Sequence, residues 1–241
     1  MNRFATVAIL ALVAGCTTTA DPLATSTAAP AAESGPRVSA SQAGRNFDTV
    51  IRRVAPVARQ ICQEKAPRAN CNYQIYVDER PNQPVNAFQT EDESGRPVIV
   101  FTRPLIEDAR NADELAFILG HEAAHHIEGH LAATRVNSQL GAVLLGSLAQ
   151  AYGLSGSGVD TAATVGAEIG SRTFSKGYET EADSLGAEIA WRAGYDPVRG
   201  VAFFSRTPDP GDQFLGTHPP NASRQANVRK IASQFQQAQG V

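Results

Sequence analysis

Residues 121–130 read HEAAHHIEGH, with four histidines and two glutamates in ten positions. Apolar residues recur at helical spacing around this stretch, from Leu115 to Leu131. Upstream, Asn111 is a candidate helix cap and Glu114 follows three positions later, the pattern of a capping box. The sequence therefore predicts one helix that begins after Asn111 and carries the histidine-rich stretch.

Two of the histidines share one face of this helix. Residues four apart on an α-helix lie about 40° apart around its axis, so His121 and His125 present their imidazoles one turn apart. This geometry suits two ligands of one tetrahedral zinc ion. Glu122 stands beside the first histidine, where its carboxylate can reach a metal-bound water. The pattern is typical of a metallohydrolase, but so short a motif also arises by chance. A zinc site of this kind would need a third ligand from elsewhere in the chain.

The third ligand does not follow the metzincin pattern, which requires a glycine at position 128 and a histidine at position 131. Glu128 and Leu131 occupy those positions. His130 falls on the far side of a continuous helix from His121, so it is not expected to be a ligand. Glu179 and Asp183 share a face of a later helix, and one can bind a metal while the other supports a ligand.

The other polar side chains of the stretch are expected to carry no chemistry. His126 lies one turn beyond Glu122 and could modulate that base, but a histidine in such a place more often packs or meets solvent. Glu128 and His130 are expected to form an exposed pair.

The remaining pattern predicts an α+β domain of mainly helices around a small sheet. Residues 73–77 and 97–102 have the composition of strands, and with the turn-forming residues 93–96 between them they predict a small antiparallel or mixed sheet beside the histidine-rich helix. The expected helices cover residues 39–62, two small-residue segments within 139–170, residues 178–192, a restart at Pro197 and a segment after Asn221. The glycine-rich residues 153–158 are expected to form a mobile loop near the cleft.

The first residues have the character of a secretory signal. Residues 1–15 hold one arginine and a short apolar run, and their end resembles a bacterial lipobox with Cys16 as the lipidated residue. The alternative is an ordinary signal in which Cys16 is incidental. Residues 16–38 are then an anchored Ala/Thr/Ser/Pro tether, and residues 39–241 are the domain. These features predict a periplasm-facing, lipid-anchored protein in contact with a membrane; Thr17 favours the outer membrane.

Cys62 and Cys71 remain as an even pair in a compartment that permits disulfides, so we expect them to be bridged; two free buried thiols are the alternative. The net charge of −3 includes no basic block, which excludes a nucleic-acid partner on electrostatic grounds.

With these motifs in order, the sequence resembles the HtpX-like and CAAX-prenyl-protease-like zinc endopeptidases (Ste24-type gluzincins), above all their soluble periplasmic members of the BepA and LoiP type. The matching pieces are Asn86-Ala87-Phe88, residues 121–125, Phe174-Ser175-Lys176, residues 179–183, residues 193–197 and Thr217-His218-Pro219.

The resemblance implies a role for each matching residue. His121, His125 and Glu179 become the ligands of one Zn²⁺ ion per chain, Glu122 the general base and Asp183 the support of the ligands. The segment Asn86, Ala87 and Phe88 becomes the edge strand that binds an extended substrate. His218 could stabilise the oxyanion or close the open metal position; a structural loop histidine is the alternative.

The sequence thus predicts a zinc endopeptidase that cleaves misfolded or misassembled proteins of the bacterial cell envelope. A chaperone-like envelope assembly factor with a mostly latent metal site is the main alternative. A structural lipoprotein in which the histidine motif is accidental is the third hypothesis. The sequence makes no prediction of oligomeric state.

Overall fold

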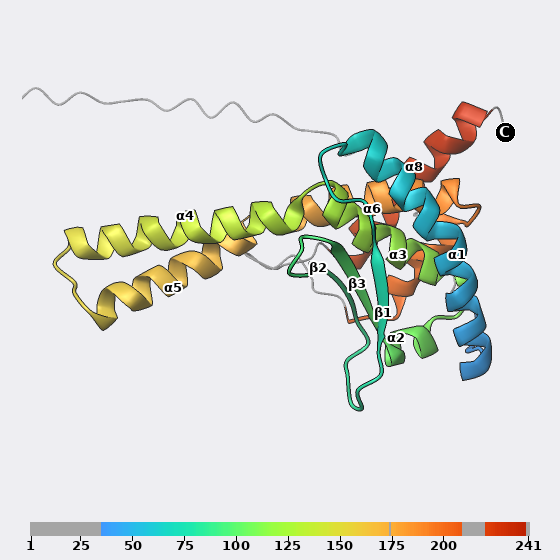
Figure 1. Ribbon diagram of the computed structural model, residues 1–241, viewed down its shortest axis with the longest axis horizontal. Helices are drawn as coiled ribbons and strands as arrows, with labels where there is room; N and C mark the ends of the chain where they lie inside the picture. The colour runs from blue at the N-terminus through green and yellow to red at the C-terminus, as the bar shows by residue number, and fades with distance from the viewer. Residues whose placement is uncertain (1–34, 174, 209–219, 240–241) are drawn as a thin grey trace, which may run out of the picture. The chain divides into compact units, whose positions relative to one another are not determined.

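The computed structural model describes residues 35–173, 175–208 and 220–239, which form helices around a small sheet (Figure 1). The predicted α+β class is confirmed. The helices are α1 (Ala40–Lys65), α2 (Arg103–Asp108), α3 (Ala112–Ile127), α4 (His130–Ala151), α5 (Ser157–Arg172), α6 (Ser175–Arg192), α7 (Pro197–Val201), the 3₁₀ turn η1 (Ala202–Ser205) and α8 (Asn221–Gln239). Within this described part of the chain, every helix is too short or too polar to cross a membrane.

The sheet is mixed, with strand order β1-β3-β2. β1 (Gln74–Asp78) pairs in parallel with β3 (Pro97–Thr102), and β2 (Ala87–Glu91) pairs with β3 in antiparallel register. The mixed sheet is one of the two arrangements, antiparallel or mixed, that the sequence predicts, and the pairing of β1 with β3 is its parallel part. β3 is the most buried strand, so this apolar segment takes the central place, and β2 is left at an edge.

α3 runs through the centre of the fold, between α1, α6 and the sheet (Figure 1). Its residues from Leu115 to Leu119 are buried, although the helix carries the polar motif one turn later. α3 and α6 meet backbone to backbone: a Cβ atom on Gly186 would lie 2.7 Å from the amide nitrogen of His121. This close approach brings the carboxylates of α6 within reach of the histidines of α3.

The start of α3 has half of the predicted capping box. The Asn111 side chain accepts a hydrogen bond from the Glu114 amide at 3.0 Å. The Glu114 carboxylate does not return to Asn111; it accepts from the Arg110 amide at 2.8 Å and pairs with Arg206 at 2.8 Å. Because Glu114 is fully buried, an arginine partner satisfies its charge better than a second cap would.

α4 and α5 form a helical hairpin that extends away from α3 and the sheet (Figure 1). Two helices of small residues were predicted here, and that prediction is confirmed. The loop of residues 152–156 lies at the far end of this hairpin from α3, so its predicted place near the cleft is wrong.

Cys62, near the end of α1, and Cys71, ahead of β1, form a disulfide with their Cα atoms 5.7 Å apart. Further along the chain, Gly194 has a left-handed φ of +84° after α6, and Asp196 caps α7. These two residues turn the chain at the position predicted from the sequence, so that α8 can return against α6.

Candidate metal centre

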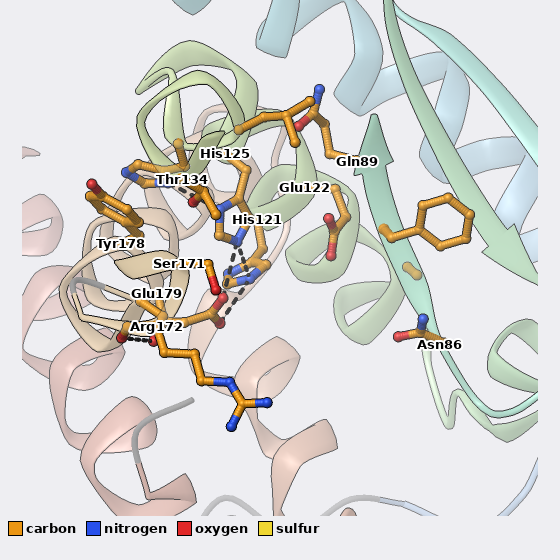
Figure 2. A pocket seen from close by; sticks show the side chains of 15 residues that line it. Asn86, Gln89, His121, Glu122, His125, Thr134, Ser171, Arg172, Tyr178 and Glu179 are labelled. Atoms are coloured by element: carbon orange, nitrogen blue, oxygen red, sulfur yellow. Dashed lines mark hydrogen bonds and ion pairs between the residues drawn. The ribbon is translucent and has the colours of Figure 1, made fainter. Parts of the chain in front are cut away.

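Three nitrogen and oxygen donors from two helices converge at the centre of the fold. The Nε2 atoms of His121 and His125 lie 3.0 Å apart. Glu179 reaches across from α6, with its carboxylate oxygens 3.4 Å from each of these nitrogens (Figure 2). One donor atom from each residue lies within 4.8 Å of the others. The three predicted ligands are thus brought together.

The spacing of these donors fits a small divalent ion. Ligands about 2.0–2.1 Å from a tetrahedral zinc ion are separated from one another by about 3.3 Å. The separations of 3.0, 3.4 and 3.4 Å among the two imidazoles and the carboxylate are close to that value. Two imidazoles with one carboxylate also form a donor set that zinc enzymes use while keeping a fourth position open.

His121 is held by a buried charge pair. Its Nδ1 atom lies 3.0 Å from the carboxylate of Asp183. Arg224 of α8 donates two hydrogen bonds to the same carboxylate, at 2.8 and 2.6 Å, and all three side chains are buried. Asp183 thereby fixes the Nδ1–H tautomer of His121 and directs Nε2 towards Glu179. Asp183 thus lies where its predicted role as support of a ligand requires. Arg224, which holds Asp183 in turn, was not predicted from the sequence.

The charges around His121 favour a cation. Burial lowers its pKa, but the hydrogen bonds with Asp183 and Glu179 outweigh burial and raise the pKa of His121 to about 10. Burial has the opposite effect on a carboxylate and raises the pKa of Asp183. The hydrogen bonds and charges of Arg224 and His121 outweigh burial, so the pKa of Asp183 is lowered. The carboxylates therefore stabilise positive charge at the place where the donors meet.

His125 is held by a second imidazole. Its Nδ1 atom lies 3.0 Å from Nδ1 of His130, whose Nε2 atom lies 3.0 Å from the carboxylate of Glu181. The His130 ring also stacks on Tyr178, with centroids 4.6 Å apart. Burial lowers the pKa of His130, the hydrogen bond with Glu181 opposes this effect, and the charge of His125 adds to it. A neutral His130 can accept a hydrogen bond at Nδ1 from His125 and donate one from Nε2 to Glu181.

The expectation that Glu128 and His130 form an exposed pair is wrong for His130, which is 4 % exposed. α3 ends at Ile127, and Gly129 takes a left-handed φ of +71° before α4 begins at His130. The predicted helix through Leu131 would have put His130 on the far side. The turn at Gly129 instead returns its ring to His125.

Glu122 borders the cavities on both sides of the donors. A cavity of about 490 Å³ is lined by His121, Glu122 and His125 on one side and by β2 on the other. A second cavity, of about 250 Å³, lies between Glu122, Phe203 and Arg224. Figure 2 shows the Glu122 carboxylate between His121 and the strand that leads on from Asn86. Its position gives it access to a molecule placed between the donors and β2.

The predicted edge strand lies at this cavity. Asn86, Ala87 and Phe88 all line it, and β2 is the outer strand of the sheet. The Thr102 amide donates to the Asn86 carbonyl at 2.9 Å, and pairs alternate along antiparallel strands. Ala87 and Gln89 therefore direct their backbone N–H and C=O groups away from β3, towards the open edge.

The other predicted residues lie elsewhere. His126 donates a hydrogen bond from Nε2 to the Asn70 carbonyl at 2.8 Å and packs edge-on against Tyr73, so it is a packing residue. Cys16 and His218 lie outside the described residues, as does Phe174 of the matching motifs.

A helix with paired histidines and a glutamate beside a sheet edge, completed by a carboxylate from a second helix, is the arrangement of a metallopeptidase. The family model described as Peptidase family M48 matches residues 45–232. The match covers most of the chain, and the chain belongs to this family of metallopeptidases. The resemblance found in the sequence is confirmed.

Two curated relatives with the same name illustrate the similarity. The chain is 31% identical over 150 residues to the beta-barrel assembly-enhancing protease of Escherichia coli (strain K12). It is 29% identical over 153 residues to the protein of the same name from Yersinia pestis. Each match covers 57% of this chain and 31% of the relative, so the chain is similar to about a third of the length of these proteins.

Proposed function

We propose that this chain is a zinc endopeptidase of the bacterial cell envelope that cleaves misfolded or misassembled proteins in extended segments. The observation that carries the proposal is the convergence of His121, His125 and Glu179 beside Glu122, at a cavity bounded by a free strand edge. The names of the relatives support proteolysis in that setting.

His121, His125 and Glu179 would hold the zinc ion. A zinc ion held there would polarise the scissile carbonyl and lower the pKa of the attacking water. Glu122 takes the proton of the attacking water on its carboxylate and delivers it to the leaving amine. Asp183 and His130 hold the two imidazoles in the orientation that this chemistry requires.

The substrate binds as an added strand along β2. Ala87 and Gln89 offer the backbone hydrogen bonds, which recognise an extended chain whatever its sequence. Folded proteins rarely present a free strand, so this mode selects unfolded or misassembled segments. His218, which is not among the described residues, would donate a hydrogen bond to the oxyanion or close the open metal position.

The chain acts on the periplasmic side of a membrane, held by a lipid on Cys16 after removal of residues 1–15. Attachment to the outer membrane is the proposed location. Metabolic labelling with a radioactive fatty acid tests this part, since Cys16→Ser would remove the label.

Glu122→Gln tests the proposed chemistry. The substitution keeps size and hydrogen bonding but removes the base, so cleavage of unfolded casein by the full chain should fall by at least about 100-fold. Zinc content, measured by mass spectrometry, should stay at one ion per chain. Glu128→Gln is the matched control, because Glu128 is exposed at the end of the same helix. Wild-type cleavage by Glu122→Gln would overturn the proposal.

The relatives' name, which refers to assembly, favours a second candidate. In it the chain acts as a chaperone-like assembly factor and the metal site is mostly latent. The two candidates differ in a cell that lacks the protein: complementation by Glu122→Gln supports the assembly factor, and failure to complement supports the peptidase.

A further inference from the structure

The outward face of α4 carries large apolar side chains that no described residue covers. Val143 and Leu144 are 67 % and 68 % exposed, and Tyr152 at the end of the helix is 82 % exposed. Val136, Leu140, Leu148 and, in the following loop, Leu154 are exposed as well. We call these seven residues the α4 outer face. An exposed apolar surface of this extent is unusual for a protein surface that meets only water.

The inward face of the same hairpin is built from small residues. Gly141 and Gly166 touch backbone to backbone, and a Cβ atom on either would overlap the carbonyl of the other. Gly170 meets the backbone of Asn137 in the same way. α4 and α5 therefore hold together through close contact of their backbones and leave the large side chains outside.

This arrangement is the reverse of packing in water. A helix of a soluble domain turns its large apolar residues inward, against its neighbours. Helices in lipid meet through glycine and alanine and present large apolar residues to the acyl chains. The hairpin of α4 and α5 packs in the manner of helices in lipid along most of its length.

The distribution of charge agrees with a lipid environment on one side only. Residues 136–159 contain no Lys, Arg, Asp or Glu, and this segment includes the whole α4 outer face. α5 exposes a polar stripe of Asp160, Thr164 and Glu168, and beside it the less exposed Val165 (44 %) and Ile169 (40 %). The hairpin thus carries its most exposed apolar side chains on α4 and most of its charges on α5, the asymmetry of an element that lies in a membrane interface.

We propose that the α4 outer face docks on a lipid bilayer and lies in its interfacial layer, with α5 towards the water. No helix of the described residues is apolar enough to span a bilayer, so the contact is a shallow one. Tyr152 fits this depth, because tyrosine has an apolar ring and a polar hydroxyl and favours the interface.

The proposed anchor makes this docking geometrically possible. An extended tether from Cys16 to Ser39 spans up to roughly 75 Å. α4 has 22 residues and is about 33 Å long, which is shorter than this span. The bilayer that holds the proposed anchor can therefore also contact α4. This step alone uses the proposed anchor; the exposed face and the inverted packing stand without it.

The charges of the hairpin also predict the kind of lipid contact. Arg135 and Arg172 are balanced by Asp160 and Glu168. With no excess of positive charge, docking depends on apolar burial and should be similar on neutral and anionic vesicles and insensitive to salt.

A tryptophan reporter tests the proposal at the face itself. The full chain carries Cys16→Ser, which prevents acylation, and Trp191→Phe, which removes its single tryptophan. Leu144→Trp then places an indole on the α4 outer face, and Thr164→Trp places one on the outward side of α5 as the matched control. With phosphatidylcholine vesicles, Leu144→Trp fluorescence should shift to shorter wavelength and be quenched by brominated lipid, while Thr164→Trp fluorescence should do neither.

Either of two results would overturn the proposal. If vesicles leave the Leu144→Trp emission unchanged, lipid does not contact this face. If that emission is already shifted without vesicles and light scattering shows a dimer that Leu144→Lys dissociates, a second copy of the chain covers the face instead. A supporting measurement is vesicle binding by Leu144→Ser in a chain with the same Cys16→Ser background, which should weaken about tenfold while casein cleavage stays unchanged.

Discussion

The Nδ1 atoms of His125 and His130 lie 3.0 Å apart, and this contact connects one metal-site histidine to Glu181 through a second imidazole. The other metal-site histidine, His121, is oriented by the carboxylate of Asp183. The two imidazoles therefore have different supports, a buried charge pair and a histidine chain. Each support can be removed separately.

Replacement of His130 by alanine should weaken zinc binding about 10- to 100-fold, because His125 loses the partner that fixes its ring. Competition with a chromophoric chelator measures this affinity. His126→Ala is the control, since His126 contacts Asn70 and Tyr73 and none of the donors. Unchanged affinity in His130→Ala would show that the contact has no role in positioning the metal.

Removal of Arg224 should lower the stability of the folded chain. Asp183 is fully buried, and Arg224→Ala leaves its charge without the two hydrogen bonds it now accepts. The free energy of unfolding should fall by about 3–5 kcal/mol. Urea denaturation measures this change. Lys230→Ala, on the exposed side of the same helix, should stay within about 0.5 kcal/mol of wild type; a similar loss in both variants would contradict the assignment.

The contact between α3 and α6 predicts a strong effect of one methyl group. Gly186→Ala places a Cβ atom 2.7 Å from the His121 amide nitrogen, so the helices must separate. We expect a loss of about 1–3 kcal/mol in unfolding free energy together with loss of bound zinc. Gly177→Ala on the same helix meets no atom within 4 Å and should retain both. Normal zinc content in Gly186→Ala would mean that the close approach does not set the site.

Chelation should destabilise the wild-type chain reversibly. An ion that binds the folded state at 100 times its dissociation constant stabilises it by about 2.7 kcal/mol. Treatment with 1,10-phenanthroline should therefore lower the melting temperature, and added zinc should restore it. His121→Ala should melt at the same temperature with and without zinc; a zinc-dependent rise in that variant would place the ion elsewhere.

Much of this structure follows from local patterns in the sequence. The spacing of His121 and His125 places them on one helical face, and the same rule places Glu179 and Asp183 on another. A glycine and an N-cap locate the end of α6, before Gly194, and the start of α7, after Asp196. These features depend on residues near each other in the chain, so a single sequence reveals them.

Features that depend on distant contacts could not be predicted in the same way. Arg224 is in a helix whose spacing gives no sign of Asp183, 41 positions earlier. Helical periodicity puts His130 on the wrong side because it continues the helix through Gly129, where the structure has a break; a glycine followed by polar residues is a sequence signal for such a break. The sequence allows an antiparallel or a mixed sheet, and strand composition does not decide between them, so the parallel pairing of β1 with β3 is known only from the structure.

Anomalous diffraction at the zinc edge, on crystals of the full chain grown with one equivalent of zinc, tests whether the three donors bind the ion. We expect a single peak about 2.0–2.2 Å from Nε2 of His121, Nε2 of His125 and a carboxylate oxygen of Glu179. No peak among these atoms, or a zinc ion bound by other side chains, would contradict it.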